Sequence, residues 1–135
     1  MNNRRDFLKA SAAVTSVLAI SSVSTAFATA GTPYSNIIYT AQNPGKWDGK
    51  QGSHAPEVTV MDGKVTVVTK HSMSEAHYIV RHTLVLEDGT FVGGTTFGPA
   101  DKPESSYELP AGYTGKICAT SFCNLHDFWL TEVQV

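Results

Sequence analysis

Short runs rich in Val, Ile, Thr and Tyr, several of which alternate apolar with polar positions, occupy most of the chain from residue 37 onwards. A period of two is typical of strands that bury one face. These runs predict strands at Ile37–Thr40, Glu57–Val60, Lys64–Thr69, His77–Leu86, Thr90–Val92, Ser105–Leu109, Tyr113–Ser121 and Phe128–Val135. No helical period of useful length interrupts them.

Turn signals separate the runs. Asp62-Gly63 stands between two alternating runs and predicts a two-residue hairpin. Further signals are Asn43-Pro44-Gly45, Asp88-Gly89, Gly93-Gly94 and Pro110-Ala111-Gly112. Seven or eight short strands in about 100 residues are typical of a sandwich. We therefore predict an all-β fold, an immunoglobulin-like antiparallel β-sandwich of about seven strands.

The first 28 residues break the strand pattern. A twin-arginine motif, Asn3-Arg4-Arg5-Asp6-Phe7-Leu8-Lys9, precedes an apolar run and two small-residue cleavage sites, Ala26-Phe27-Ala28 and Ala28-Thr29-Ala30. We predict a twin-arginine signal peptide over residues 1–28, a β-sandwich domain over residues 29–135, and a periplasmic location. An uncleaved membrane anchor is the alternative, but the run is short and its Ser and Thr residues make it weakly apolar for a spanning helix.

The charge changes when this segment is removed. Loss of Arg4, Arg5, Lys9 and Asp6 leaves 7 of the 10 basic and 11 of the 12 acidic side chains, a formal charge of −4. Such an acidic chain gives no indication of a nucleic-acid partner. The remaining ~107 residues suit one domain with one core.

Five side chains on this framework can bind a transition metal: His54, His71, His77, Cys123 and His126. Imidazole suits iron, copper, nickel and zinc, and a single thiolate adds a soft, electron-donating ligand, so the set indicates redox iron or copper. A structural zinc site normally closes at four ligands. Five ligands around an ion that prefers six positions leave one position open for a substrate, which is the pattern of a catalytic centre.

The predicted strands bring these residues to one end of the sandwich. Cys123 and His126 fall in a tight loop between two strands, where residues three apart can point at one ion. His71 falls in the loop after the strand that ends at Thr69, and His77 begins the next strand. His54 lies in the irregular segment 45–56, which can reach the same end.

Other conspicuous residues are expected to serve the fold. His82 and Cys118 each lie five residues from a candidate ligand along a strand and so face the opposite side. We therefore expect His82 not to be a ligand, and Cys118 to be a small buried side chain rather than a disulfide partner. The aromatic residues expected in the core or in the wall of the site are Trp47, Phe128 and Trp129.

Three motifs occur in order along about residues 42–135. They are Gly45-Lys46-Trp47-Asp48-Gly49 with His54-Ala55-Pro56, then His71-Ser72-Met73-Ser74-Glu75-Ala76-His77-Tyr78-Ile79, then Cys123-Asn124-Leu125-His126. Together they resemble the superoxide reductases of the neelaredoxin and desulfoferrodoxin family. The resemblance implies an immunoglobulin-like sandwich that holds a square-pyramidal mononuclear iron. Its implied equatorial ligands are His54, His71, His77 and His126, and Cys123 is the implied axial thiolate. No four-cysteine domain precedes this region, so the chain resembles the one-iron members.

The resemblance also implies a reaction. Superoxide would be reduced by one electron to hydrogen peroxide at the open position opposite Cys123, with the iron cycling between Fe2+ and Fe3+. The thiolate would favour release of peroxide over O–O cleavage, and backbone amides near the sulfur would tune the potential. An external one-electron donor, rubredoxin-like or a cytochrome, would restore Fe2+. Family habit makes a homo-dimer or homo-tetramer the expected assembly.

Two departures from the family pattern concern the loops. Family members commonly carry Glu-Lys before the first histidine, where this chain has Gly52 and Ser53. We expect Lys50 to supply the cation that attracts superoxide, which makes it the candidate catalytic residue. The carboxylate has no clear replacement, although Glu75 is near in sequence to both His71 and His77. The family often has proline at the position of Ser72, a change that should alter only loop stiffness.

Two alternatives belong to other classes. A cupredoxin-like copper carrier is also a small exported β-sandwich with a Cys and nearby His, but blue-copper sites usually place a weak axial Met after the last His. No Met follows His126. A noncatalytic periplasmic metal-binding or electron-transfer sandwich would explain the missing Glu-Lys pair. Metal identity separates the first alternative from the reductase, and superoxide turnover separates the second.

Overall fold

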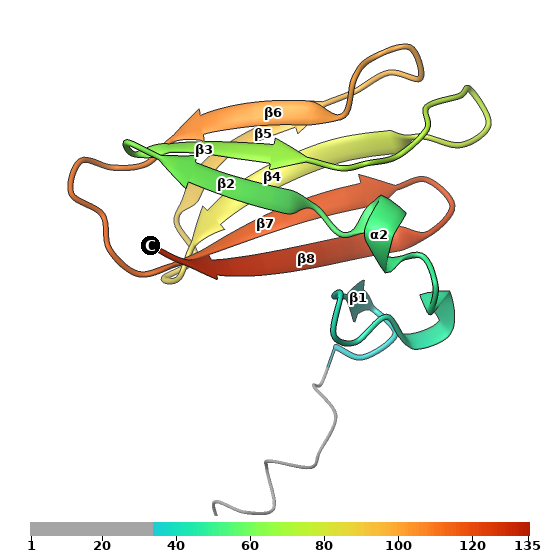
Figure 1. The fold of residues 1–135 in the computed structure, drawn as a ribbon, viewed down its shortest axis with the longest axis horizontal. Coiled ribbons are helices and arrows are strands. Elements are labelled where there is room, and N and C mark those ends of the chain that lie inside the picture. Colours follow the sequence, from blue (N-terminus) through green and yellow to red (C-terminus); the bar gives the residue numbers. More distant parts are fainter. Residues whose placement is uncertain (1–33) are drawn as a thin grey trace, which may run out of the picture. The chain divides into compact units, whose positions relative to one another are not determined.

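Two β-sheets face each other in the part of the chain that the structure, a computed structural model, describes, residues 34–135 (Figure 1). The strand order is β1–β8–β7–β4–β5 in the five-stranded sheet and β2–β3–β6 in the three-stranded sheet. The strands are β1 (Ile38–Tyr39), β2 (Glu57–Met61), β3 (Lys64–Val68), β4 (Ile79–Leu86), β5 (Phe91–Thr96), β6 (Glu104–Glu108), β7 (Lys116–Cys123) and β8 (Asp127–Gln134). The predicted all-β sandwich is confirmed. The predicted signal peptide lies outside the described residues.

The strands pair antiparallel with one exception among the described residues. The short β1 runs parallel to β8, with Ile38 beside Phe128 and Tyr39 beside Trp129. In β7 every second residue from Ile117 to Cys123 is buried. This alternation follows from the pleat, which sends successive side chains to opposite faces of a sheet. The apolar periodicity of the sequence therefore reports directly which face of β7 lies inside.

The hairpin between β2 and β3 follows from its two turn residues. Asp62 and Gly63 have φ values of 50° and 76°, and Met61 lies opposite Lys64 on either side of them. A type I′ turn needs positive φ at both central positions, and Asp-Gly adopts it at low cost. The hairpin predicted from this dipeptide is confirmed. We call this end of the sandwich, on the left in Figure 1, the hairpin end.

The opposite end, on the right in Figure 1, holds the β7–β8 turn and two short helical pieces, and we call it the α2 end. The helical pieces are η2 (Gly45–Trp47), a 3-10 turn, and α2 (Gln51–His54). They stand where the sequence predicted an irregular segment, since four residues are too few to show a helical period. Among residues 34–135 no helix is long and apolar enough to span a membrane.

Two predicted boundaries next to the candidate ligands were wrong. β4 begins at Ile79, so His77 lies in the preceding loop, where its backbone pairs with Ser74. β7 continues to Cys123, which pairs with Asp127 across the turn. Residue preferences indicate where a strand forms, but the ladder of hydrogen bonds to its neighbours decides where it ends.

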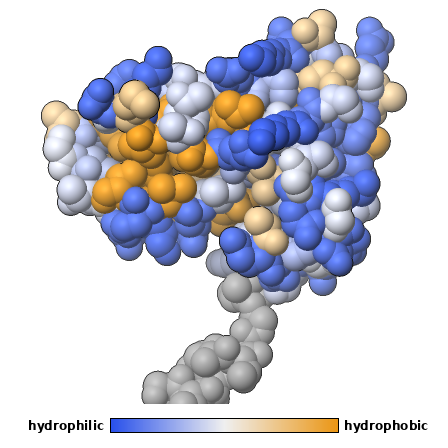
Figure 2. All heavy atoms as spheres, in the orientation of Figure 1, coloured by the Kyte–Doolittle hydropathy of each residue, from blue (hydrophilic) through white to orange (hydrophobic). Residues whose placement is uncertain are grey.

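The main hydrophobic core lies between the sheets. Its buried members are Val65, Val67, Leu84, Leu86, Tyr107, Ile117 and Ala119. In Figure 2 apolar side chains gather on the visible face, in the region that lies between β2 and β8 in Figure 1. Val58, Val60 and Val133 pack partly buried against the main core. A smaller cluster formed by Ile79, Phe97 and Cys123 includes the candidate thiolate ligand. Cys123 is thereby anchored by apolar packing.

Candidate metal centre

Five side chains from different elements meet at the α2 end. His54 is the last residue of α2, His71 and His77 lie in the β3–β4 loop, Cys123 ends β7, and His126 lies in the β7–β8 turn. Contacts between their nitrogen and sulfur atoms join all five. The structure therefore brings together every metal ligand that the sequence predicted.

The ring nitrogens are spaced as neighbouring ligands of one ion. Three contacts of 3.0 Å run from His54 Nε2 to His126 Nδ1, from His126 Nδ1 to His77 Nε2, and from His77 Nε2 to His71 Nε2. Metal–nitrogen bonds of about 2.1 Å at right angles separate neighbouring nitrogens by about 3.0 Å, whereas tetrahedral angles would separate them by about 3.4 Å. The observed spacing fits a square arrangement.

The imidazole rings themselves form a square. Neighbouring ring centroids are 4.4 to 4.7 Å apart, and the planes of neighbouring rings meet at 64° to 86°. His54 and His77 face each other across the square, with centroids 5.8 Å apart and planes within 26° of parallel. His71 and His126 therefore occupy the other two corners.

The cysteine sulfur adjoins this square. Cys123 Sγ lies 3.6 Å from His126 Nδ1 and 4.0 Å from His71 Nε2, and the residue is fully buried. The ligand atoms of His54, His77, Cys123 and His126 all lie within 4.8 Å of one another, and His71 adjoins this tighter group through its contacts with His77 and Cys123. Each ring nitrogen carries at most one proton and donates it in one direction, so a central cation satisfies the converging lone pairs better than they satisfy one another. Four imidazoles and one thiolate fit an iron ion.

Helix α2 orients His54. Its Nδ1 lies 3.2 Å from the carbonyl oxygen of Lys50 and 2.8 Å from Ser53 Oγ. A ring N–H that donates to a carbonyl leaves the other nitrogen, Nε2, with a free lone pair for a metal. Burial and then the charges of His71 and His126 lower the pKa of His54 to about 4. His54 is therefore neutral at pH 7, the state that a ligand requires.

Two more of the imidazoles are shifted in the same direction. Burial lowers the pKa of His71, and the charge of His77 adds to the shift. Burial also lowers the pKa of His126, followed by the charge of Lys50. Both shifts favour the neutral ring.

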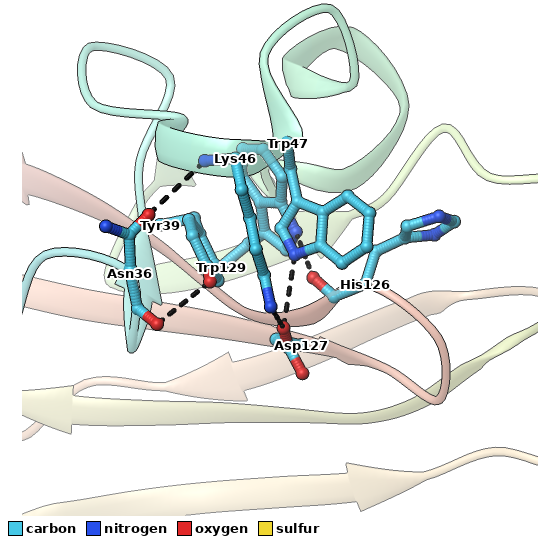
Figure 3. Close-up of polar contacts among 7 residues, drawn as sticks. All are labelled: Asn36, Tyr39, Lys46, Trp47, His126, Asp127 and Trp129. Atoms are coloured by element: carbon cyan, nitrogen blue, oxygen red, sulfur yellow. Dashed lines mark hydrogen bonds and ion pairs between the residues drawn. The ribbon is translucent and has the colours of Figure 1, made fainter.

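Two tryptophans and an aspartate brace His126 (Figure 3). Trp129 Nε1 donates to the His126 carbonyl at 2.9 Å, and Trp47 Nε1 donates to the Asp127 carboxylate at 3.1 Å. The Trp47 ring also meets the His126 ring edge to face, with centroids 4.6 Å apart. Asp127 has a φ of 64°, and its carboxylate forms an ion pair with Lys46 Nζ at 3.4 Å. The β7–β8 turn is thereby tied to η2.

An asparagine ties the same turn to the loop that carries His77. Asn124 Oδ1 accepts the N–H of Tyr78 at 3.0 Å, and Asn124 Nδ2 donates to the Ala76 carbonyl at 3.1 Å. The sequence analysis quoted Asn124 only as part of a motif. A polar residue between two candidate ligands, in a tight turn, was the available signal for this bridging role.

The remaining sequence predictions have mixed outcomes. Both ring nitrogens of His82 are hydrogen-bonded to Thr69 and Ser105 instead of meeting the candidate ligands. Cys118 has no disulfide partner but is only half-buried, on the outer face of β7 near Glu132, so its predicted burial was wrong. Phe128 was expected in the core or site wall but is 47% exposed and packs against Phe122. The strand pleat sends both side chains outward.

Parts of this chain are similar to known proteins. The sequence model of the desulfoferrodoxin family matches residues 46–132, and that of the twin-arginine translocation signal matches residues 1–21. The desulfoferrodoxin of Nitratidesulfovibrio vulgaris strain Hildenborough is 34% identical over 91 residues, which cover 65% of this chain and 68% of that protein. The signal match indicates export by the twin-arginine route, as predicted.

Solved structures share the fold. The superoxide reductase (neelaredoxin) of Ignicoccus hospitalis matches with a TM-score of 0.64 at 24% identity, covering 74% of this chain and 94% of that one. The superoxide reductase of Treponema pallidum matches with a TM-score of 0.53 at 28% identity, covering 62% and 69%. The desulfoferrodoxin family match and a cluster able to hold a metal ion support the predicted mononuclear iron cofactor. The match over residues 46–132, more than half of the sequence, shows that this chain belongs to the desulfoferrodoxin family.

Proposed function

We propose that this protein is a superoxide reductase, a non-haem iron oxidoreductase that converts superoxide to hydrogen peroxide. The observation that carries the proposal is the run of three 3.0 Å contacts that links the ring nitrogens of four histidines beside one fully buried cysteine sulfur. The residues that would hold the iron are His54, His71, His77, Cys123 and His126. Membership of the desulfoferrodoxin family supports this assignment.

The burial of the ligands suits a small substrate from solvent. Cys123 is fully buried, whereas His71, His77 and His126 are partly exposed. Solvent therefore reaches these three imidazoles but neither His54 nor the sulfur. A ferrous ion bound here supplies one electron, which with two protons converts superoxide to hydrogen peroxide. The neutral imidazoles and the thiolate hold the geometry, and the thiolate donates electron density that tunes the potential.

Lys50 is the proposed cation that guides superoxide to the centre. It precedes α2, is half-buried, and its charge lowers the pKa of His126. A positive charge that acts on the ligand cluster also raises the local concentration of an anionic substrate. Lys46 is less suited to this role because it is paired with Asp127 at 3.4 Å.

Ser53, at the position where family members commonly carry lysine, has another role. The Ser53 hydroxyl contacts His54 Nδ1 at 2.8 Å and donates to the Lys50 carbonyl at 3.2 Å. Ser53 therefore helps to orient a ligand. Glu75, the carboxylate nearest in sequence to His71 and His77, is exposed in the β3–β4 loop.

The proposed setting follows from the export signal. We infer that residues 1–28 are removed, that the domain of residues 29–135 works in the periplasm, and that it forms a homo-dimer or homo-tetramer. An external one-electron donor, rubredoxin-like or a cytochrome, restores Fe2+ after each turnover.

The experiment that tests the function combines metal analysis with fast kinetics. The exported protein is analysed for metal, its spectrum is recorded after oxidation, and its reduced form is mixed rapidly with superoxide. One equivalent of iron, a visible thiolate-to-iron band and rapid one-electron oxidation by superoxide are expected. Iron with the same band but a slow reaction would move the function to a noncatalytic or electron-transfer role, and copper would favour a cupredoxin-like carrier.

A further inference from the structure

A second polar cluster lies inside the sandwich, apart from the ligands. Its members are at most 7% exposed: Thr69, His82, Ser105 and Ser121. They come from both sheets, because Ser105 lies on β6 and Thr69 follows β3, whereas His82 lies on β4 and Ser121 on β7. We call these four residues the His82 chain. Buried polar groups destabilise a fold unless they are hydrogen-bonded, so their arrangement matters.

The His82 chain is joined by three hydrogen bonds of 2.8 Å. Thr69 Oγ1 donates to Ser121 Oγ, so it accepts from His82 Nε2–H, and His82 Nδ1 in turn accepts from the Ser105 hydroxyl. Burial lowers the pKa of His82 to about 4, so the ring is neutral at pH 7 and this direction of donation is stable. The His82 chain therefore links the two sheets through hydrogen bonds of defined length.

Both linked strands lead directly to metal ligands. The Thr69 carbonyl accepts the N–H of His71 at 2.8 Å. Ser121 precedes Cys123 by two residues on the same buried face of β7. Phe97 packs edge to face on His82, with centroids 4.8 Å apart, and belongs to the same apolar cluster as Cys123. The His82 chain is thus continuous with the candidate centre on two sides.

We propose that His82 is a positioning residue of the metal centre. By holding Thr69 against Ser121, it sets the separation between the segment that carries His71 and the strand that carries Cys123. The atoms whose distance it controls are His71 Nε2 and Cys123 Sγ, 4.0 Å apart. Directional hydrogen bonds between the sheets determine this distance more sharply than apolar contacts do. The inference rests on the ligand set of the proposed function.

The test measures metal binding instead of turnover. The probe is Co2+ alone, added to the metal-free chain at pH 7, with its thiolate absorption band as the readout and a chelator as competitor. The variants are His82→Leu and Thr69→Val, each checked for native circular dichroism. Loss of a residue that orients a metal ligand typically weakens metal binding about 10–100-fold. We expect both variants to bind Co2+ more weakly by this factor and to show a shifted thiolate band.

The matched control is Leu84→Ala. Leu84 is fully buried two residues further along β4, in the main core. It should lower stability but leave Co2+ affinity within about twofold of the parent, because separate sites act independently. The control thus separates a general loss of stability from a loss of ligand positioning.

The outcomes discriminate clearly. In the first outcome the parent binds Co2+ with a thiolate band, and folded His82→Leu has the same affinity and the same band. The positioning role is then overturned, and the ligand set stands. If His82→Leu does not fold, Thr69→Val decides by the same two readouts, since it preserves side-chain shape. If the parent itself shows no thiolate band, the ligand set and the positioning role both fail.

Discussion

The two ends of the sandwich are built from contacts of different range. At the hairpin end, turns such as Asp62-Gly63 join strands that are neighbours in sequence. At the α2 end, contacts join residues far apart in the chain: His54 and His126 are separated by 72 positions, and Trp47 and Asp127 by 80. The hairpin end is therefore encoded locally, whereas the α2 end exists only when the whole sandwich has formed.

The difference extends to what stabilises each end. Apolar side chains of the main core extend toward the hairpin end, and they bury surface without any bound group. At the α2 end the ring nitrogens converge at 3.0 Å. Metal binding offsets the cost of bringing these polar atoms together, so metal affinity and local order at this end are coupled.

The largest effect is expected from removing the thiolate at the α2 end. Cys123→Ser should abolish the thiolate-to-iron band and lower superoxide turnover by more than about 100-fold, because losing even an outer partner of a ligand costs about 10–100-fold. Absorption spectroscopy and fast mixing with superoxide measure both. The control is Cys118→Ser, a half-buried cysteine on the outer face of β7, which should leave both unchanged. A fully active Cys123→Ser variant with an unchanged spectrum would sink the ligand assignment.

Truncating a core side chain nearer the hairpin end should lower stability and leave the spectrum of the metal centre unchanged. Ile117 is fully buried in the main core near the start of β7. Ile117→Ala should lower the free energy of unfolding by about 2–5 kcal/mol through the lost apolar contacts and the cavity left behind. Urea unfolding measures the loss. The thiolate-to-iron band of the folded variant should stay where it is, and a displaced band would show that the two ends are not independent.

Lowering the pH should lower the free energy of unfolding through the buried His82. The pKa of His82 in the fold, about 4, lies below its ordinary value of 6.5, so the unfolded chain takes up a proton first as pH falls. The contribution of His82 to the free energy of unfolding is thus complete above about pH 6.5 and falls as the pH drops toward 4. Between pH 7 and pH 5 this group lowers the free energy of unfolding by about 2 kcal/mol. Urea unfolding of the metal-free chain at both pH values tests this. His82→Gln should lose about 2 kcal/mol less over the same interval; an identical loss would contradict the prediction.

The smallest effect concerns substrate guidance. Lys50→Ala should slow the second-order reaction with superoxide several-fold and weaken its dependence on ionic strength, since the cation acts over a distance comparable to the screening length. Lys64→Ala is the matched control, because it removes the same charge from an exposed residue beside the β2–β3 hairpin. Fast kinetics at two salt concentrations compare the variants. Equal rates for the two would show that Lys50 has no guiding role.

Much of the fold was predictable from local patterns. Alternating residues in β7 and the Asp62-Gly63 dipeptide correctly indicated a strand and a hairpin, because pleat and turn geometry act on neighbouring residues. The errors arose where distant partners decide. His77 precedes β4, and Cys123 remains in β7, because the ladders to neighbouring strands end there.

The candidate site was predictable as a set of residues but not as an arrangement. The three motifs identified His54, His71, His77, Cys123 and His126. The order of the rings around the square could not be read from them, nor could the Trp47 brace, the Asn124 bridge or the His82 chain. Each of these depends on which atoms of distant segments come within about 3 Å, the range of a hydrogen bond.

The sequence by itself therefore determined the ligand types, the strand periodicity and the export signal, since residue chemistry and local backbone preference are properties of short segments. The tertiary structure alone decided that His54 stands opposite His77 and that His82 links the two sheets. The physical reason is that these features are distances between segments, and only packing of the two sheets on one another sets those distances.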